Sequence, residues 1–94
     1  MKIGILKEHR SEEKRVAIVP STVSALSKKG YEFFLESDSG LLSNYYDNDY
    51  IEAGAKIVSQ NEVFDCDIVC KVNAPSDEEV SLLKPGTLFI SLLQ

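Results

Sequence analysis

Short apolar segments alternate with helix-like segments along the whole chain, and this alternation limits the possible folds more than any other feature of the sequence. The apolar segments have the length and the β-branched or aromatic content of strands. Expected strands cover residues 2–7, 31–36, 55–58, 68–72 and 87 onward, and expected helices cover residues 20–29, 49–53, 61–64 and 76–83. Strands that alternate with helices predict a parallel sheet with right-handed crossover connections.

The predicted fold is therefore α/β: a Rossmann-like or flavodoxin-like open parallel sheet of about five strands with flanking helices, in the order 3-2-1-4-5. The segment 68–72 is almost wholly apolar, as expected for a strand covered on both faces. In this order the winding reverses between the first and the fourth strand, and open α/β sheets hold ligands at such a reversal. The 94 residues suit one domain, residues 1–94.

Composition excludes several classes of protein. The net charge of -5 argues against a nucleic-acid partner, because phosphate binding needs clustered cations. No apolar run approaches the ~18 residues of a membrane span, and charges from Lys7 onward interrupt any secretory signal. Cys66 and Cys70 lie four residues apart, too far to bridge along a strand, and the single histidine, His9, is distant. We therefore expect reduced thiols in a cytosolic protein and no metal site.

A charged loop, residues 7–15, follows the first strand where a nucleotide-binding fold would carry its glycine-rich turn. Gly4 stands alone within the strand, so no cofactor-binding residue is expected in this chain. Two cations flanked by apolar residues, Arg15 and Lys71, fall at the predicted crevice. A pair of cations in a partly dry crevice suits a small carboxylate, which Arg can bind through two parallel hydrogen bonds.

A purely structural interpretation of the same residues is open. Arg15 could pair with Glu8, Glu12 or Glu13, and Lys71 could reach water through its flexible stem. His9 has no identifiable partner. The acidic residues 77–79 are expected to be a solvated helix start, and the tyrosines at positions 45, 46 and 50 are expected to pack a loop.

Several motifs, in order, resemble one family over nearly the entire chain. They occupy residues 2–8, 13–17, 20, 36–37, 53–55, 71–75 and 82–87. These segments look like the N-terminal region of alanine dehydrogenases and of the alpha subunit of proton-translocating NAD(P) transhydrogenase. In alanine dehydrogenases the positions matching Arg15 and Lys71 bind the substrate carboxylate and carbonyl. Those enzymes also carry a substrate histidine near the end of the fifth strand, where this chain reads Leu92-Leu93-Gln94.

The missing histidine and the run Lys71-Val72-Asn73-Ala74-Pro75 favour the transhydrogenase alpha subunit. This resemblance implies hydride transfer from NADH to NADP coupled to proton translocation. It implies an NAD-binding domain after residue 94, so the chain alone should be inactive and hold no cofactor. Expected partners are that domain, membrane and NADP-binding subunits, and a second copy in a homodimer. The expected location is the cytoplasmic side of the inner membrane.

Two alternatives are an alanine dehydrogenase-type NAD-dependent amino-acid oxidoreductase and a non-catalytic binding or interaction module. The chain closes on a strand-like segment, residues 87–94, with no helix after it. Domains seldom stop on a central strand, so we expect this chain to be a piece of a longer polypeptide.

Overall fold

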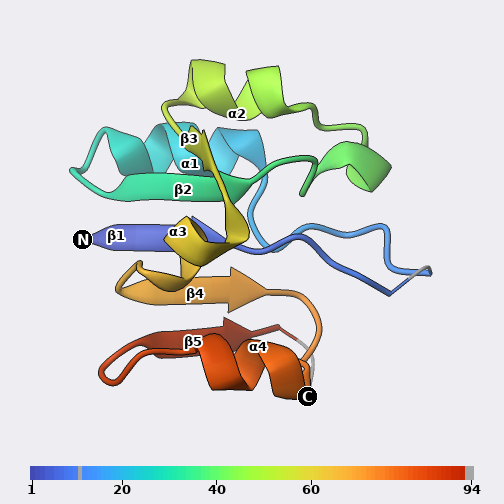
Figure 1. The fold of residues 1–94 in the computed structure, drawn as a ribbon. Coiled ribbons are helices and arrows are strands. Elements are labelled where there is room, and N and C mark those ends of the chain that lie inside the picture. Colours follow the sequence, from blue (N-terminus) through green and yellow to red (C-terminus); the bar gives the residue numbers. More distant parts are fainter. Residues whose placement is uncertain (11, 93–94) are drawn as a thin grey trace.

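A computed structural model describes residues 1–10 and 12–92, which form a single twisted sheet with helices on both faces (Figure 1). The expected alternation of strands and helices is present. The elements in chain order are β1 (Lys2–Ile5), α1 (Pro20–Ser27), β2 (Glu32–Glu36), the 3-10 helix η1 (Leu41–Ser43), α2 (Asp47–Ala53), β3 (Lys56–Val58), α3 (Gln60–Phe64), β4 (Ile68–Lys71), α4 (Asp77–Leu82) and β5 (Leu88–Ser91).

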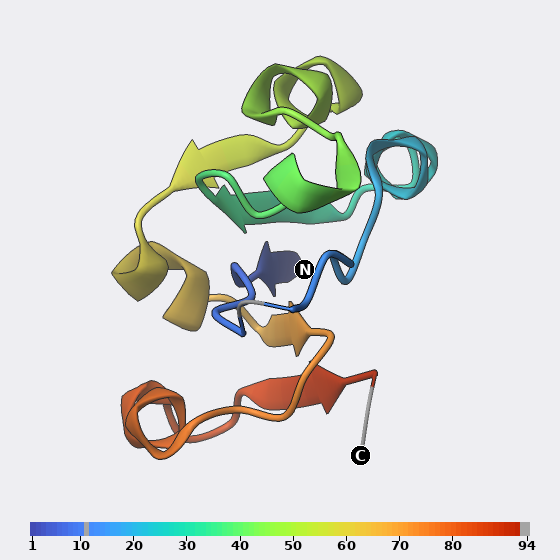
Figure 2. The ribbon, with the colours of Figure 1, turned by 90° about the vertical axis from the view of Figure 1, so that its right-hand side faces the viewer.

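The five strands are all parallel and lie in the order β3-β2-β1-β4-β5, which confirms the predicted fold class and strand order. Gly4 on β1 pairs with Phe34 on β2 and with Val69 on β4, so β1 is central. Because the order reverses between β1 and β4, the carboxyl ends of these two strands border the expected crevice. Figure 2 looks onto that carboxyl edge.

Two apolar clusters cover the two faces of the sheet. On one face Ile5, Phe33 and Leu35 pack with Val23 of α1 and Tyr50 of α2. On the other face Leu6 and Val69 pack with Val63 and Phe64 of α3. Figure 2 shows α3 and α4 on one side of the sheet and α1 on the other. Strands buried on both faces explain why residues 68–72 are so uniformly apolar.

Gly4 allows α3 to approach the sheet closely. A Cβ atom at this position would lie 2.7 Å from Val63 Cγ1 and 2.8 Å from the Val63 carbonyl oxygen. Such distances are shorter than real carbon contacts, so a side chain here would push α3 away. The lone glycine of the first strand therefore serves packing.

Element boundaries differ from the expected ones by a few residues. The strand β1 ends at Ile5, although the Leu6 amide still donates to the Cys70 carbonyl at 3.1 Å. The helix α1 ends at Ser27, and Gly30 follows with φ of 97°. Helix α4 is capped by Ser76, as expected, and its side-chain oxygen accepts the Glu79 amide at 3.2 Å.

One detail of the sequence-based expectation needs correction. The start of α4 is only partly solvated, because Glu79 is 3% exposed. Its carboxylate is held inside by Lys71 and by the Ser76 amide.

Of the three tyrosines, only Tyr50 is buried, whereas Tyr45 and Tyr46 are exposed. Both cysteines are buried free thiols. Across the described ranges, the helices are too short or too polar to cross a membrane.

Candidate functional site

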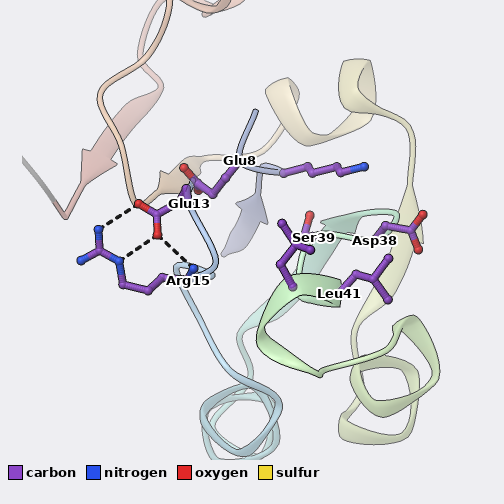
Figure 3. A pocket seen from close by; sticks show the side chains of 8 residues that line it. Glu8, Glu13, Arg15, Asp38, Ser39 and Leu41 are labelled. Carbon is purple, nitrogen blue, oxygen red and sulfur yellow. Dashed lines mark hydrogen bonds and ion pairs between the residues drawn. The ribbon is translucent and has the colours of Figure 1, made fainter. Parts of the chain in front are cut away.

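The described parts of the loop that joins β1 to α1, residues 6–10 and 12–19, lie at the carboxyl edge of the sheet. Its charged residues meet the end of β2 and the helix η1 around a cavity of about 160 Å³. The lining residues are Lys7, Glu8, Glu13, Arg15, Asp38, Ser39, Leu41 and Leu42. In Figure 3 the Glu13–Arg15 pair lies on one side of this cavity and Ser39 and Leu41 lie on the other.

Arg15 is held by Glu13 through a two-pronged ion pair. The Arg15 Nε donates to Glu13 Oε2 at 2.8 Å, and a terminal guanidinium nitrogen donates to Oε1 at 2.8 Å. The Arg15 amide donates to the same carboxylate at 2.9 Å. The Arg15 side chain is 62% exposed, whereas the Glu13 side chain is 7% exposed. One edge of the guanidinium is thus fixed, and its outer edge faces solvent (Figure 3).

This pairing shifts the ionisation of both groups. Hydrogen bonds from the Arg15 side chain and amide, opposed by burial and aided by Asn73, lower the pKa of Glu13 to about 2. The hydrogen bonds to Glu13 raise the pKa of Arg15 further. Both groups are therefore charged throughout the neutral range. Among the pairings considered from sequence, the one with Glu13 is the one that forms.

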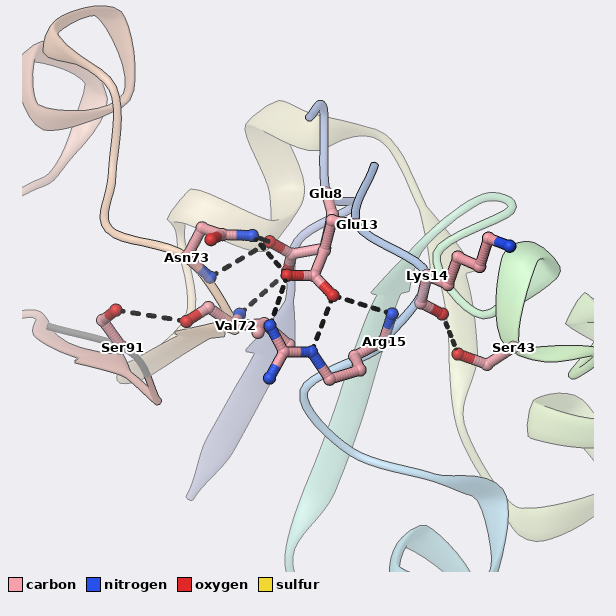
Figure 4. A network of polar contacts seen from close by, with 8 residues as sticks. All are labelled: Glu8, Glu13, Lys14, Arg15, Ser43, Val72, Asn73 and Ser91. Atoms are coloured by element: carbon pink, nitrogen blue, oxygen red, sulfur yellow. Dashed lines mark hydrogen bonds and ion pairs between the residues drawn. The ribbon is translucent and has the colours of Figure 1, made fainter. Parts of the chain in front are cut away.

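A second carboxylate, Glu8, joins the loop to the end of β4 (Figure 4). It accepts the Val72 amide at 2.9 Å, the Asn73 amide at 3.2 Å and the Asn73 side-chain nitrogen at 3.2 Å. The same Asn73 nitrogen donates to Glu13 at 2.9 Å. Asn73 therefore bridges the two carboxylates, and the chain Glu8–Asn73–Glu13–Arg15 forms one continuous network.

Lys71 lies apart from this network. Its ammonium group donates to Glu79 Oε1 at 2.7 Å, and the two side chains are 6% and 4% exposed. Burial would raise the pKa of Glu79, but the hydrogen bonds from Lys71 and Ser76 outweigh it and lower the pKa. The stem of Lys71 does not carry its charge to water, so that structural interpretation is wrong. The described residues that line the cavity include Arg15 but not Lys71.

The sequence pointed to Arg15 but missed the roles of Glu8 and Asn73 at the site. Glu8 comes shortly after β1 and Asn73 shortly after β4, and these two strands flank the predicted reversal. Their positions after these strands could have predicted that they lie together, because the carboxyl ends of neighbouring parallel strands meet at one edge of the sheet. Binding of a ligand by Arg15 and Lys71 stays a prediction.

The site does not have the features of a dinucleotide cradle. In such a cradle a short glycine-rich turn leads from the first strand straight into a helix, whose N-terminus holds the pyrophosphate. Here residues 6–19 separate β1 from α1 and contain no glycine, and Pro20 opens the helix. Within residues 1–10 and 12–92, there is no cluster of three or more histidine, cysteine, aspartate or glutamate residues that could hold a metal ion.

Comparison with known proteins identifies relatives over nearly the full chain. Residues 4–94 match the family model described as alanine dehydrogenase/PNT, N-terminal domain. The chain is 40% identical over 93 residues to the NAD(P) transhydrogenase subunit alpha of Haemophilus influenzae, covering 99% of this chain and 18% of that protein. It is 45% identical over 94 residues to an alanine dehydrogenase of Staphylococcus haemolyticus, covering 99% of this chain and 25% of that protein.

Solved structures show the same two similarities. A transhydrogenase from Sinorhizobium meliloti superposes with a TM-score of 0.93 and 30% identity, over 99% of this chain and 28% of the other. An L-alanine dehydrogenase superposes with a TM-score of 0.90 and 34% identity, over 95% of this chain and 25% of the other. The chain thus spans between 18% and 25% of the length of the two curated relatives.

Proposed function

The chain belongs to the alanine dehydrogenase/PNT N-terminal domain family, and from this premise we propose that it is the N-terminal part of an NAD(P) transhydrogenase alpha subunit. The family is one of oxidoreductases. In the proposed full-length protein, hydride passes from NADH to NADP and the transfer is coupled to proton translocation. The NAD-binding domain follows residue 94, and the present domain forms the wall of the cleft that faces it.

The burial of Lys71 carries this proposal. An amino-acid dehydrogenase needs its substrate cations free to meet a carboxylate and a carbonyl. Here the Lys71 ammonium group is 2.7 Å from Glu79 inside the protein and is absent from the lining of the described cavity. The resemblance to alanine dehydrogenases implies a substrate histidine near the end of β5, whereas the residues that follow Ser91 in this sequence read Leu92-Leu93-Gln94. Both features support a reaction without an amino-acid substrate.

The proposal extends to the rest of the assembly. Membrane and NADP-binding subunits or domains, and a second copy of the chain, are the proposed partners. The soluble part lies on the cytoplasmic side of the inner membrane, to which other segments attach it. The 18% coverage of the Haemophilus influenzae subunit leaves ample length for an NAD-binding domain. Alone, the 94-residue chain is proposed to be inactive and to hold no cofactor.

A second candidate is an alanine dehydrogenase, and one observation favours it. The chain is 45% identical to the Staphylococcus haemolyticus enzyme, a higher identity than to the transhydrogenase subunit. In this alternative the exposed outer edge of Arg15 binds the substrate carboxylate, and Lys71 must leave Glu79 to join it.

Two assays of the full-length protein separate these candidates. The first measures NADH-dependent reduction of an NADP analogue in membranes that contain the whole assembly, and the second measures alanine-dependent reduction of NAD. Activity in the first assay alone supports the transhydrogenase. Activity in the second assay alone, abolished by Arg15→Ala and retained in the matched variant Arg10→Ala, would replace our proposal with the alanine dehydrogenase.

A further inference from the structure

The crevice between the carboxyl ends of β1 and β4 is the usual ligand position of an open α/β sheet. In this chain the position is filled by the protein itself. The Glu8 carboxylate accepts the Val72 and Asn73 amides at 2.9 and 3.2 Å, and the Asn73 side-chain nitrogen at 3.2 Å (Figure 4).

The three donors have the arrangement of an anion site. Consecutive backbone N–H groups that converge on one point form concavities that bind anions. Hydrogen bonds from such donors to an ionised carboxylate are stronger than neutral ones. The donors come from the end of β4, whereas the carboxylate comes from the loop after β1, 64 positions earlier in the chain than the Val72 amide.

We propose that Glu8 is an internal anion: it fills the anion position at the β1–β4 crevice, excludes carboxylate and phosphate ligands from it, and confines ligands to the cavity on the β2 side. Glu8 is thereby a specificity-determining residue of this site. The inference stands on these contacts and applies to either enzyme considered above. It also agrees with the expectation that no nucleotide phosphate binds at the first strand of this fold.

Glu8 acts on Arg15 through the network, so it is also a positioning residue. The Asn73 side-chain nitrogen donates to both Glu8 and Glu13, and both oxygens of Glu13 hold the Arg15 guanidinium. With Glu8 in place, Asn73 is fixed by two hydrogen bonds to the Glu8 carboxylate, and its side-chain nitrogen also donates to Glu13. The outward direction of Arg15 at the cavity follows from that chain of contacts.

The proposal predicts that removing Glu8 creates a binding site. Glu8→Ala deletes a CH₂–COO⁻ group, which has nearly the size and charge of acetate, and leaves the three donors facing the space. We expect acetate, titrated into the 94-residue variant at constant ionic strength with chloride, to shift the Val72 and Asn73 amide NMR signals saturably. The affinity should be at least tenfold higher than for the unmodified chain. The Arg15 Nε–H signal should return toward its original position as acetate binds.

Two controls separate a filled anion site from a simple structural pin. Glu12→Ala removes an exposed carboxylate from the same loop and should bind acetate no better than the unmodified chain. Glu8→Gln keeps the shape of the Glu8 side chain and removes its charge. The glutamine should therefore still block acetate from the three donors, whereas the Arg15 Nε–H signal should move. If Glu8→Ala unfolds, acetate and not chloride should restore the folded spectrum, because a ligand that binds only the folded state stabilises it.

Definite results would overturn the assignment. One is a Glu8→Ala chain that shows neither a saturable acetate shift at Val72 and Asn73 nor stabilisation by acetate. Another is equal acetate binding by the unmodified chain and the variant. Because these measurements use no cofactor and no hydride transfer, their failure is distinguishable from a failure of the proposed enzyme function.

Discussion

Individual buried polar groups decide how the loops of this domain are fixed. The Tyr50 hydroxyl donates to the Ile18 carbonyl at 2.8 Å and joins α2 to the segment that leads into α1. Tyr50 is fully buried. Burial is the largest cause that raises the pKa of its hydroxyl, and the nearby Tyr45, Asp49 and Asp47 raise it further. The hydroxyl therefore remains a hydrogen-bond donor over the whole working range of pH.

Tyr50→Phe should reduce the free energy of unfolding by about 1 kcal/mol, the usual value of one neutral hydrogen bond. The ring stays and keeps its packing, so only the bond to the Ile18 carbonyl is lost. Urea unfolding followed by circular dichroism measures the change. Tyr31→Phe, which removes an exposed hydroxyl, is the matched control and should leave stability within ~0.5 kcal/mol. Equal changes in the free energy of unfolding for the two variants would show that the Tyr50 hydrogen bond does not stabilise the fold more than an exposed hydroxyl does.

Glu13 makes stability depend on pH in the acid range. Its pKa is about 2 in the folded chain and 4.5 is the ordinary value, so the folded state binds the proton less tightly than the unfolded state does. The stabilising contribution is therefore complete above pH ~4.5 and is lost as pH falls toward about 2. Arg15 and Asn73, which donate to this carboxylate, are the cause.

Glu13→Gln should therefore be less stable than the unmodified chain at pH 7, and the difference should shrink between pH 4.5 and pH 2. Urea midpoints at several pH values measure this convergence. Glu12→Gln changes an exposed carboxylate next to Glu13 and should give a nearly constant difference. A Glu13→Gln difference that does not change with pH would contradict the assigned pairing.

At the scale of elements, one buried ion pair joins β4 to α4. Lys71 is the last residue of β4 and Glu79 lies in the first turn of α4. The Lys71 Nζ to Glu79 Oε1 distance is 2.7 Å, and both side chains are nearly inaccessible. Among residues 1–10 and 12–92, no hydrogen-bond partner reaches the buried second oxygen of Glu79. Removing one partner leaves the other charge buried and alone, which is more costly than removing both.

Lys71→Met and Glu79→Gln should each destabilise the fold by about 3–5 kcal/mol, whereas the double variant should cost less than the sum of the two. Thermal and urea unfolding of the four chains give the coupling free energy. Additive effects would show that the two groups do not depend on each other. The exposed pair Lys84 and Asp65, treated in the same way, is the control and should couple by less than ~1 kcal/mol.

The sequence predicted the fold better than it predicted which partners the charged side chains contact. The parallel sheet followed from the alternation of strands and helices, which is a property of consecutive residues, and the order 3-2-1-4-5 was the expected order for such a sheet. Lys71 was recognised as a cation that must find an anion, but Glu79 looked like part of a solvated helix start. The contact forms because the segment between β4 and α4 brings Glu79 within hydrogen-bond distance of Lys71, eight positions earlier in the chain. Likewise Glu8 and Asn73 are separated by 65 positions and meet only once β1 and β4 are neighbours.

At the scale of the whole molecule, the carboxyl edge has the position of a ligand site but lacks the glycine-rich turn and the adjoining helix start of a dinucleotide cradle. Residues 6–19 separate β1 from α1 along the sequence, and Glu8 accepts the Val72 amide just after β4. The cations at the cavity are balanced by carboxylates, since Lys7 and Arg15 stand against Glu8, Glu13 and Asp38. A pyrophosphate would therefore meet no net positive charge there.

NADH added to the 94-residue chain should bind no more tightly than about 1 mM, because neither a helix N-terminus nor a glycine turn is available to its phosphates. Fluorescence titration of NADH measures this directly, and isothermal calorimetry checks it without an optical probe. The full-length protein is the control: there NADH should bind with micromolar affinity, because the proposed NAD-binding domain after residue 94 is present. Micromolar binding to the 94-residue chain, lost in Arg15→Ala, would instead place a cofactor site at this edge. Weak binding by the short chain and tight binding by the long one would locate the cofactor outside this domain, and would leave Arg15 and its network to shape the facing wall of the cleft.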